Sequence, residues 1–359
     1  MNAEYKEGLS RMVVRKTAIA LALLLGWSGT AASGPALLFD TTNGRVLYAE
    51  DQDQPWHPAS LTKIMTAYLV FEALKSGAVT LEQKIPVSAN AHALPPSKLG
   101  FPVGAELSVN LALKALIIKS ANDSAVMLAE AIGGTEEAFV RKMNETALRL
   151  GMTQTRFVNP HGLPAPEQVT TARDLARLTR AVLSDYPGYG ELWAMADMQI
   201  GRRRLRTHNG LLRTYEGADG LKTGFICDSG FNVVATATRD NRRLAAVVLG
   251  EYTSRDRSLR AASLLEHGFR TYGWKEILSS TTVDTVPVSA ESTTPRSVRD
   301  LVASFACNGK RQARAVPTKR SKKARANAKA KKRATTEAAA SAPKRMESGS
   351  GSASAAKSN

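Results

Sequence analysis

The sequence predicts a mixed α/β protein of the α+β type, in which strands from both ends of one domain form a single antiparallel sheet. Short β-branched or alternating apolar runs occur near residues 35–51 and again at residues 220–252. Between them lie longer segments with apolar residues at helical spacing. Strands at both ends with helices between them favour one sheet covered by helices.

A hairpin and then a series of helices are expected in the first half of the chain. In PALLFDTTNGRVLYAED, residues 35–51, two apolar runs flank Asn43-Gly44, a dipeptide typical of tight hairpin turns. The segment SLTKIMTAYLVFEALKSG, residues 60–77, has apolar side chains at helical spacing and ends at a glycine, which is a helix stop. Further helices are expected at residues 107–120, 123–134, 136–151 and 171–185.

Strands dominate the last third of the domain. GLKTGFI, residues 220–226, is followed by GFNVVATATRD, residues 230–240, and by RRLAAVVLGEY, residues 242–252. We expect a tight turn at Asp240-Asn241 between the last two strands. A helix at LRAASLLEHGFRTY, residues 259–272, then closes the domain.

Most of the positive charge lies at the C-terminal end. The chain has 359 residues and a formal net charge of +17. Residues 310–359 contain 15 Lys or Arg and 2 Glu, a net charge of +13, so only +4 belongs to the residues before them. This Lys/Arg/Ala-rich tail cannot bury enough apolar surface to fold alone, so we expect it to be disordered. Residues 276–309 are expected to form a linker with a short amphipathic helix, RSVRDLVASF, at residues 296–305.

Residues 1–33 have the pattern of a secretory signal peptide, with the folded domain expected at residues 34–275. A basic region precedes a Leu/Ala-rich apolar run, and small residues follow, with cleavage expected after Ala32 or Ser33. An uncleaved membrane anchor is the alternative, although the apolar run is short for a permanent span. Met12 is a second possible start, because the basic region would then begin almost at once.

The two cysteines, Cys227 and Cys307, are too few for a disulfide framework. In an exported protein they could pair with each other, and two unpaired thiols are the alternative. Cys227 follows a strand closely and could lie at the edge of a cleft, where we expect it to act as a small apolar filler.

The motif Ser60-x-x-Lys63 lies at the start of the first expected helix. On a helix the two side chains share one face, with Cβ atoms about 5–6 Å apart. A serine hydroxyl needs an adjacent base to act as a nucleophile, and a lysine can serve if burial and positive surroundings keep it neutral. The alternative is a helix cap over a solvated lysine. The same spacing recurs at residues 341–344 and 354–357. These copies lie in the expected disordered tail, where no folded structure would exclude water from the lysine.

Two further motifs make the functional interpretation stronger. Lys222-Thr223-Gly224 begins an expected strand, where a lysine and a hydroxyl can hold a carboxylate and glycine lets a ligand approach the backbone. Ser120-x-Asn122 lies in a break between two apolar helices, which can present both side chains inward. A second Ser-x-Asn, at residues 88–90, lies in a polar loop and is interpreted as incidental.

The three motifs in this order resemble the signature of penicillin-binding proteins and serine β-lactamases. The finer resemblance, over roughly residues 34–275, is to the low-molecular-weight D-alanyl-D-alanine carboxypeptidases, peptidase family S11. It is carried by HPASLTKIMTAYL, KSANDSAVMLAEAIGG, NPHGLP, VTTARDLARL, HNGLL and DGLKTGFICDSGFNVVATATR. The resemblance implies a β-lactamase/transpeptidase-like fold, with helices around a five-stranded antiparallel sheet.

The resemblance also implies roles for individual residues. Ser60 would be the acylated nucleophile, Lys63 its general base, Ser120 a proton relay to the leaving group, and Asn122 a hydrogen-bond partner of the substrate amide. Lys222 would supply positive charge.

In the same resemblance, Thr223 would bind the terminal carboxylate of the substrate. Gly224 would allow close approach, and the N–H groups of Ser60 and Phe225 would form an oxyanion hole. Arg257 falls where the family has an arginine near the carboxylate, and Arg255 and Arg260 are its rivals.

The resemblance implies an exported enzyme of the periplasm or cell envelope that cleaves peptidoglycan pentapeptides and is acylated by β-lactams. It needs no cofactor and no metal ion. The histidines of the chain do not alter this expectation. His57 is interpreted as a structural neighbour of the nucleophile, and His161 and His208 lie in loops without metal-ligand spacing.

Three alternatives stay open at this point. A class A β-lactamase would carry Ser-Asp-Asn and a deacylating glutamate, whereas this chain has Ser-Ala-Asn, and Glu167 lacks the usual following Leu-Asn. An endopeptidase that cuts peptide cross-links would use the same residues. A polyanion-binding protein would act through the basic tail on an anionic envelope surface, and nucleic acid is not expected as a partner of an exported protein.

Overall fold

The computed structural model describes residues 34–278, 280–289 and 293–307. The expected signal peptide, residues 1–33, and the expected disordered tail, residues 310–359, lie outside the described residues. Within the described ranges, no helix combines the length and the apolar content that crossing a bilayer requires.

A five-stranded antiparallel sheet forms the centre of the domain, in the order β2-β1-β9-β8-β7. It joins a hairpin from the start of the domain to three strands from its end, as the sequence predicted. Its strands are β1 (Ala36–Asp40), β2 (Val46–Glu50), β7 (Ala218–Ile226), β8 (Gly230–Arg239) and β9 (Arg242–Glu251). Two further two-stranded ribbons pair β3 (Lys84–Pro86) with β4 (Glu106–Ser108), and β5 (Asp197–Ile200) with β6 (Arg203–Arg206).

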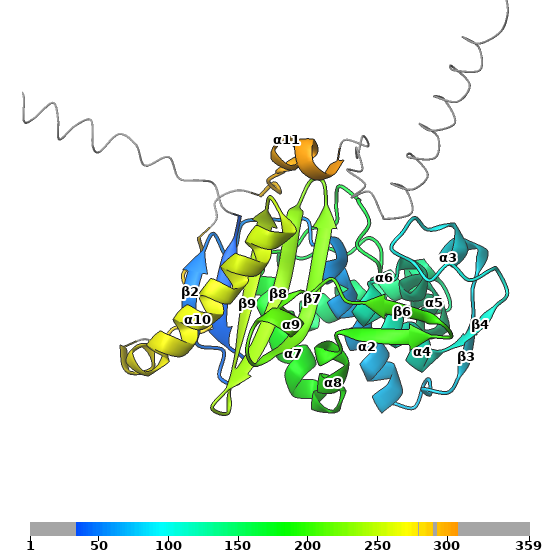
Figure 1. Ribbon diagram of the computed structural model, residues 1–359, viewed down its shortest axis with the longest axis horizontal. Helices are drawn as coiled ribbons and strands as arrows, with labels where there is room; N and C mark the ends of the chain where they lie inside the picture. The colour runs from blue at the N-terminus through cyan, green and yellow to red at the C-terminus, as the bar shows by residue number, and fades with distance from the viewer. Residues whose placement is uncertain (1–33, 279, 290–292, 308–359) are drawn as a thin grey trace, which may run out of the picture. The chain divides into compact units, whose positions relative to one another are not determined.

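Alternation along the central strands divides the apolar core into two layers. Leu37, Val234 and Val247 belong to the core that the helices between the strands complete. Their strand neighbours, such as Leu38 and Val248, pack with residues of the long helix α10 (Ser254–Leu278). Because successive side chains point to opposite faces of a strand, strands that are apolar at every position are buried on both faces. The sheet therefore lies between α10 on one face and α7 and α2 on the other (Figure 1).

The helices follow the predicted segments closely but are divided where the site lies. The main ones are α2 (Lys63–Lys75), α4 (Val109–Lys114), α5 (Asn122–Gly133), α6 (Glu136–Arg149) and α7 (Ala172–Asp185). A 3-10 turn, η1 (Ala59–Thr62), precedes α2, and a π-helical turn, η2 (Ala115–Lys119), follows α4. Short helices are α3 (Ala89–Ala93), η3 (Pro187–Tyr189), α8 (Gly190–Ala194), α9 (Leu211–Thr214), α11 (Arg299–Val302) and η4 (Ala303–Cys307).

The segment after α10, expected as a linker, lies against the domain over its described residues 280–289 and 293–307, which we call the C-terminal strap. Its first part pairs with the β1–β2 hairpin, because Val283 N–H donates to Gly44 O at 2.8 Å. Its last part contains the expected short helix, as α11 and η4. The strap ends at a disulfide between Cys227 and Cys307, so the expectation of an unpaired apolar Cys227 was wrong.

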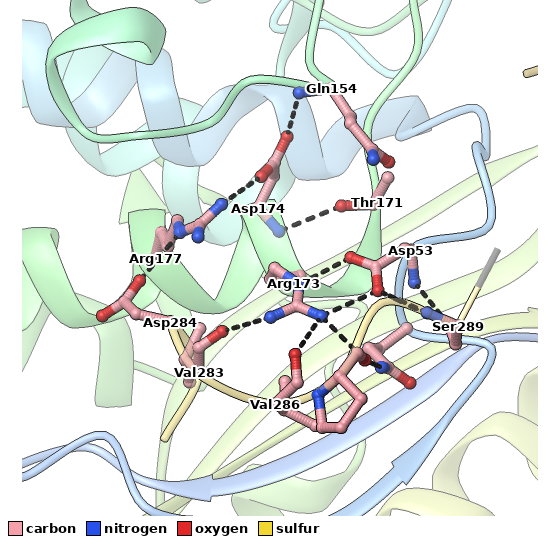
Figure 2. A network of polar contacts seen from close by, with 12 residues as sticks. Asp53, Gln154, Thr171, Arg173, Asp174, Arg177, Val283, Asp284, Val286 and Ser289 are labelled. Carbon is pink, nitrogen blue, oxygen red and sulfur yellow. Dashed lines mark hydrogen bonds and ion pairs between the residues drawn. The ribbon is translucent and has the colours of Figure 1, made fainter. Parts of the chain in front are cut away.

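A buried ion pair fixes the first part of the strap (Figure 2). Arg173 of α7 donates to both carboxylate oxygens of Asp53, at 2.5 and 2.8 Å, and both residues are buried. Arg173 also donates to the carbonyls of Val283 and Val286, each at 2.8 Å, and Ser289 N–H donates to Asp53 at 3.0 Å. Burial raises the pKa of Asp53, but the bonds from Arg173 and Ser289 outweigh it and hold that pKa below its ordinary value.

We expect the Arg173→Ala substitution to lower the free energy of unfolding by about 3–5 kcal/mol, because it leaves the Asp53 carboxylate buried without its partner. A matched control is Arg296→Ala, which removes an exposed ion pair between the strap and Asp51 at 3.4 Å. That change should cost about 1 kcal/mol or less. Urea unfolding followed by tryptophan fluorescence compares the two variants, and equal losses would show that the buried pair does not fix the strap.

Candidate active site

A cleft of about 590 Å³ lies at the β7 edge of the sheet and brings together residues from all three sequence motifs. Ser60 reaches it from η1, Ser120 and Asn122 from the η2–α5 junction, and Thr223 from β7. Its other lining residues come from three loops, from β7 and β8, and from the start of α10. They are Pro96, Ser97, Gly162, Leu163, His208, Gly210, Gly224, Phe225, Ile226, Phe231, Ser254, Arg255, Arg257 and Ser258.

Ser60 and Lys63 are in direct contact, as the first motif requires. Ser60 lies in the 3-10 turn and Lys63 is the first residue of α2, so the pair spans the change from one helix type to the other. Lys63 Nζ donates to Ser60 Oγ at 3.1 Å and to Asn122 Oδ1 at 2.8 Å, and also bonds the carbonyl of His161. The hydroxyl that faces the cleft therefore has an amine within proton-transfer distance.

The surroundings of Lys63 favour its neutral form. Its side chain is only 1% exposed. Burial and the nearby charge of Lys222 lower the pKa of Lys63 well below its ordinary value, and Asp123 offsets only part of this effect. A lowered pKa favours the unprotonated amine, which can accept a proton, so the arrangement can activate the Ser60 hydroxyl.

The second motif lies in a strained connection between η2 and α5. Ser120 has φ +60°, in the left-handed region that non-glycine residues rarely adopt, and its side chain is nearly buried at the cleft wall. Asn122 Nδ2 donates to Pro95 O at 2.9 Å, which fixes the amide so that its oxygen faces Lys63. This placement is consistent with the prediction that the break between the two helices presents a serine and an amide inward.

The third motif lies on β7, at the free edge of the sheet. Lys222 is 3% exposed, and its Nζ donates to Thr223 O at 3.1 Å. Burial first, and then the charge of Arg257, lower the pKa of Lys222 to about 7. Lys222 therefore gains and loses its charge near neutral pH, beside a threonine hydroxyl that lines the cleft.

Two glycines let the backbone around Ser60 fit between β7 and the loop at residue 162. A Cβ on Gly224 would lie 2.9 Å from Pro58 O and 3.0 Å from Ser60 N. A Cβ on Gly162, which has φ +83°, would lie 1.9 Å from Ala59 O. Side chains at these positions would displace the turn that carries Ser60, so both glycines are required for its position.

Arg257 is the arginine of α10 that reaches the cleft from a buried position. It is 5% exposed, and burial lowers its pKa to about 10, so it stays charged at neutral pH. Its Nη2 donates to His208 O at 3.3 Å, and its buried Nε has no hydrogen-bond partner among the described residues. Arg255 lies exposed at the rim, whereas Arg260 pairs with Glu50 and Glu251 at 2.9 Å each and does not line the cleft.

The residues that the sequence interpretation set aside have structural partners. His57 Nδ1 contacts Gln168 O at 2.9 Å. Ser88 caps α3 by accepting from Ala91 N at 3.0 Å, away from the cleft. His161 Nδ1 accepts from Leu163 N at 3.1 Å. Within the ranges described, no three His, Cys, Asp or Glu side chains are placed to hold a metal ion together.

Sequence reasoning missed two residues that hold the site together. Asp123 accepts hydrogen bonds from the N–H groups of Leu99 and Gly100, at 2.8 and 2.9 Å, and so fixes the loop that forms one cleft wall. Gly162 meets the nucleophile turn, as described above. Both lie inside segments that carried the family resemblance, KSANDS and NPHGLP. The signal was present, but one sequence does not say which residue of such a segment acts through packing.

Comparison with known proteins points to the same family as the motifs. A family model described as D-alanyl-D-alanine carboxypeptidase, peptidase family S11, matches residues 26–253. D-alanyl-D-alanine carboxypeptidase DacC of Escherichia coli K12 is 38% identical over 243 residues, which cover 66% of this chain and 61% of that protein. DacF of Bacillus subtilis 168 is 34% identical over 242 residues, 66% of this chain and 62% of its own length.

A solved structure gives the same result for the fold. Penicillin-binding protein D2 from Listeria monocytogenes, in its ampicillin-bound form, has a TM-score of 0.61 and 31% identity to this chain. The match covers 66% of this chain and 97% of that one. The fold is therefore that of the penicillin-binding proteins, as expected. The chain spans about three fifths of the length of the curated relatives named above.

Burial of Lys222 should lower the free energy of unfolding most at pH values below 7, where the folded protein buries a charged amine. In the unfolded chain this lysine has a pKa near 10.5, against about 7 when folded. Between these values only the unfolded state binds the proton, so stability rises with pH; below pH 7 the cost of burying the charge is complete. We therefore expect Lys222→Met to raise the free energy of unfolding at pH 6 by roughly 2–4 kcal/mol.

The gain should shrink as the pH rises from about 7 towards 10, which urea unfolding at several pH values would measure. Lys84→Met, at an exposed lysine of β3, is the control and should change stability by less than about 0.5 kcal/mol throughout. A gain that does not depend on pH would mean that packing, not the buried charge, sets the difference.

Proposed function

Because the chain belongs to the D-alanyl-D-alanine carboxypeptidase family, peptidase family S11, we propose that it is an exported serine carboxypeptidase of the periplasm or cell envelope. It removes the terminal D-alanine from peptidoglycan pentapeptides through an acyl-enzyme. The observation that carries the proposal is the contact of Ser60 Oγ with the buried amine of Lys63, at a cleft that Thr223 and Arg257 also line.

Acylation begins with proton transfer between these two residues. Neutral Lys63 takes the proton of Ser60 as Oγ attacks the carbonyl carbon of the penultimate D-alanine. The negative charge that develops on the carbonyl oxygen is stabilised by the N–H groups of Ser60 and Phe225. The close approach of β7 to the nucleophile turn at Gly224 supports this pairing of donors.

Release of the leaving D-alanine needs a proton at its nitrogen. Ser120 lines the same cleft as Ser60 and is suited to pass the proton from Lys63 to that nitrogen, so the C–N bond breaks as the amine forms. Water then attacks the ester, with Lys63 again accepting a proton, and Ser60 is regenerated. The reaction consumes one water for each D-alanine released and uses no cofactor.

Recognition of the substrate depends on its terminal carboxylate. Thr223 offers a hydroxyl, and Lys222 offers a charge below about pH 7. Arg257 stays charged at neutral pH, and its buried Nε has no hydrogen-bond partner within the described part of the chain. Asn122, which lines the same cleft, hydrogen-bonds the substrate amide, and Gly224 leaves room for the peptide along the edge of β7.

Penicillins should acylate the same serine, because a β-lactam presents a reactive amide and a carboxylate at a similar spacing. A β-lactamase as the main function is not supported by the cleft. Among the described residues that line it there is no Asp or Glu to activate deacylating water. Glu167 instead pairs with Arg156 at 2.9 Å on an exposed surface.

The basic tail, residues 310–359, lies outside the described residues, so its attraction to an anionic envelope surface stays a prediction. Salt-dependent binding to anionic vesicles, with and without these residues, tests it.

We expect the purified protein to gain the mass of one drug molecule on mixing with penicillin, and the Ser60→Ala variant to gain none. Intact-mass spectrometry measures both, and D-alanine release from a pentapeptide should be lost in the same variant. An adduct that persists in the Ser60→Ala variant would show that another residue is the nucleophile. No adduct and no D-alanine release from the wild type would refute the proposed function.

The activity should also depend on the charge of Lys222. Since its pKa in the free protein is about 7, kcat/KM for a substrate with a terminal carboxylate should fall as the pH rises above 7. Lys222→Arg keeps the charge and should move this decline to higher pH. Steady-state rates between pH 6 and about 10 test the expectation, and the same decline in both proteins would assign it to another group.

A further inference from the structure

A buried histidine that the proposed reaction does not use lies directly beside the general base. His161 is 6% exposed, and its main-chain carbonyl accepts a hydrogen bond from Lys63 Nζ. Its imidazole has two partners of its own. Nδ1 accepts from Leu163 N–H at 3.1 Å, and Nε2 lies 3.6 Å from Oε1 of Glu136, the first residue of α6.

The carbonyl of His161 decides which way the neutral amine of Lys63 points. An ammonium group has three N–H donors, and loss of one proton leaves two donors and a lone pair. Asn122 Oδ1 and the His161 carbonyl can only accept hydrogen bonds, so together they take both N–H groups of Lys63. The lone pair is then left for the third neighbour, the Ser60 hydroxyl at 3.1 Å.

The position of that carbonyl depends on the conformation of a short loop. The bond from Leu163 N–H to the His161 side chain joins residues i+2 and i, which is the pattern that asparagine forms in an Asx turn. Thr66 of α2 donates to Pro160 O at 2.6 Å and holds the start of the same loop. The imidazole of His161 therefore helps to keep its own carbonyl against Lys63.

The bond to Leu163 requires one particular form of the imidazole. Nδ1 must carry no proton to accept from Leu163 N–H, so the proton of the neutral ring is on Nε2, which faces the Glu136 carboxylate. Burial is the largest influence on the pKa of His161 and lowers it, and the charge of Lys63 lowers it further, although Glu136 opposes both. The ring is therefore neutral at pH 7, in the tautomer that the carboxylate favours.

Glu136 is itself held in place from a neighbouring helix. Its Oε2 accepts from Asn90 Nδ2 of α3 at 2.8 Å, so the asparagine of the second Ser-x-Asn pattern has a structural use away from the cleft. The contact with His161 is the largest influence on the pKa of Glu136 and lowers it, and the bond from Asn90 adds to this effect against partial burial. Glu136 is therefore ionised at neutral pH.

We propose that Glu136 and His161 are positioning residues for the general base. The Glu136 carboxylate holds the imidazole of His161 in the form that accepts from Leu163 N–H. This bond keeps the His161 carbonyl where it directs the lone pair of Lys63 at the Ser60 hydroxyl. Neither Glu136 nor His161 lines the cleft, so both act through Lys63. The inference rests on the proposed function, because that function makes Lys63 the base.

Removal of the carboxylate should slow the chemistry without weakening substrate binding. We expect Glu136→Ala to lower kcat for D-alanine release, and the rate of penicillin acylation at saturating drug, roughly tenfold, since a small displacement of a reacting group is costly. KM for the pentapeptide should change less than about twofold, because the residues that hold the substrate are unchanged. Glu137→Ala is the matched control. It removes the exposed neighbouring carboxylate from the same helix turn and should change neither rate.

Two substitutions of His161 test the imidazole independently of Glu136. Asparagine accepts from the N–H two residues on, as Nδ1 does, but is too short to reach Glu136. Glutamine can extend towards Glu136 but does not form this turn. We therefore expect His161→Asn to keep kcat within roughly threefold of the wild type and His161→Gln to lower it about tenfold or more.

The decisive measurement is the effect of Glu136→Ala in the His161→Asn background. If Glu136 acts through the imidazole, its removal there should change kcat by less than about twofold. Nitrogen-15 NMR, with the His161 signals assigned by their loss in His161→Asn, should show the proton on Nε2 in the wild type. In Glu136→Ala the same signals should show a mixture of both tautomers. Urea unfolding confirms that each variant is folded under the conditions of the rate measurements.

The inference is overturned if Glu136→Ala leaves kcat unchanged or lowers it equally in both backgrounds. It is also overturned if His161→Asn is no more active than His161→Gln, or if the wild-type imidazole carries its proton on Nδ1. Failure of the proposed function looks different, because the wild type itself would then form no penicillin adduct and release no D-alanine.

Discussion

The rest of the site depends on the burial of two lysines, Lys63 and Lys222, behind residues that line one cleft. Lys63 and Lys222 are 1% and 3% exposed, and the charge of Lys222 disfavours the charged form of Lys63. Burying a lysine is costly, but burial disfavours the protonated amine, and an unprotonated amine can act as a base. The surrounding groups limit the cost, because the Asn122 amide and the His161 carbonyl accept from Lys63. The two apolar core layers on the faces of the sheet must supply the stability that this arrangement removes.

Close backbone packing places the nucleophile beside this buried base. The turn before Ser60 passes between Gly224 and Gly162 with no room for a Cβ on either, and Ala59 has φ +49°. Ser120, which also lines the cleft, has φ +60°. Such conformations persist only where surrounding contacts enforce them. At Ala59 the side chain of Asn232, in β8, does so by donating to the carbonyl oxygens of His57 and Pro58.

Local patterns predicted the parts of this structure that local physics determines. The hairpin at Asn43-Gly44, the amphipathic helices and the strands after residue 218 follow from periodicity and turn chemistry. The motifs predicted the residues that meet in the cleft. The 3-10 turn at Ser60, the β5–β6 ribbon and the Cys227–Cys307 bond were not predicted, because each depends on contacts between distant segments. Arg257 could not be told from its neighbours until the orientation of α10 was known.

The C-terminal strap shows how a segment far from the motifs in sequence contributes to the site. Its first part is held by the buried Arg173–Asp53 pair (Figure 2), and its last part by Cys307 and by Arg299, which bonds both carboxylate oxygens of Asp228 at 2.8 and 2.7 Å. Cys227 and Asp228 form the turn after β7, directly after the cleft residues Phe225 and Ile226. Closing an 80-residue loop at this turn restricts the unfolded chain. The bonds that stabilise the fold therefore also restrain the strand end that carries a proposed oxyanion donor.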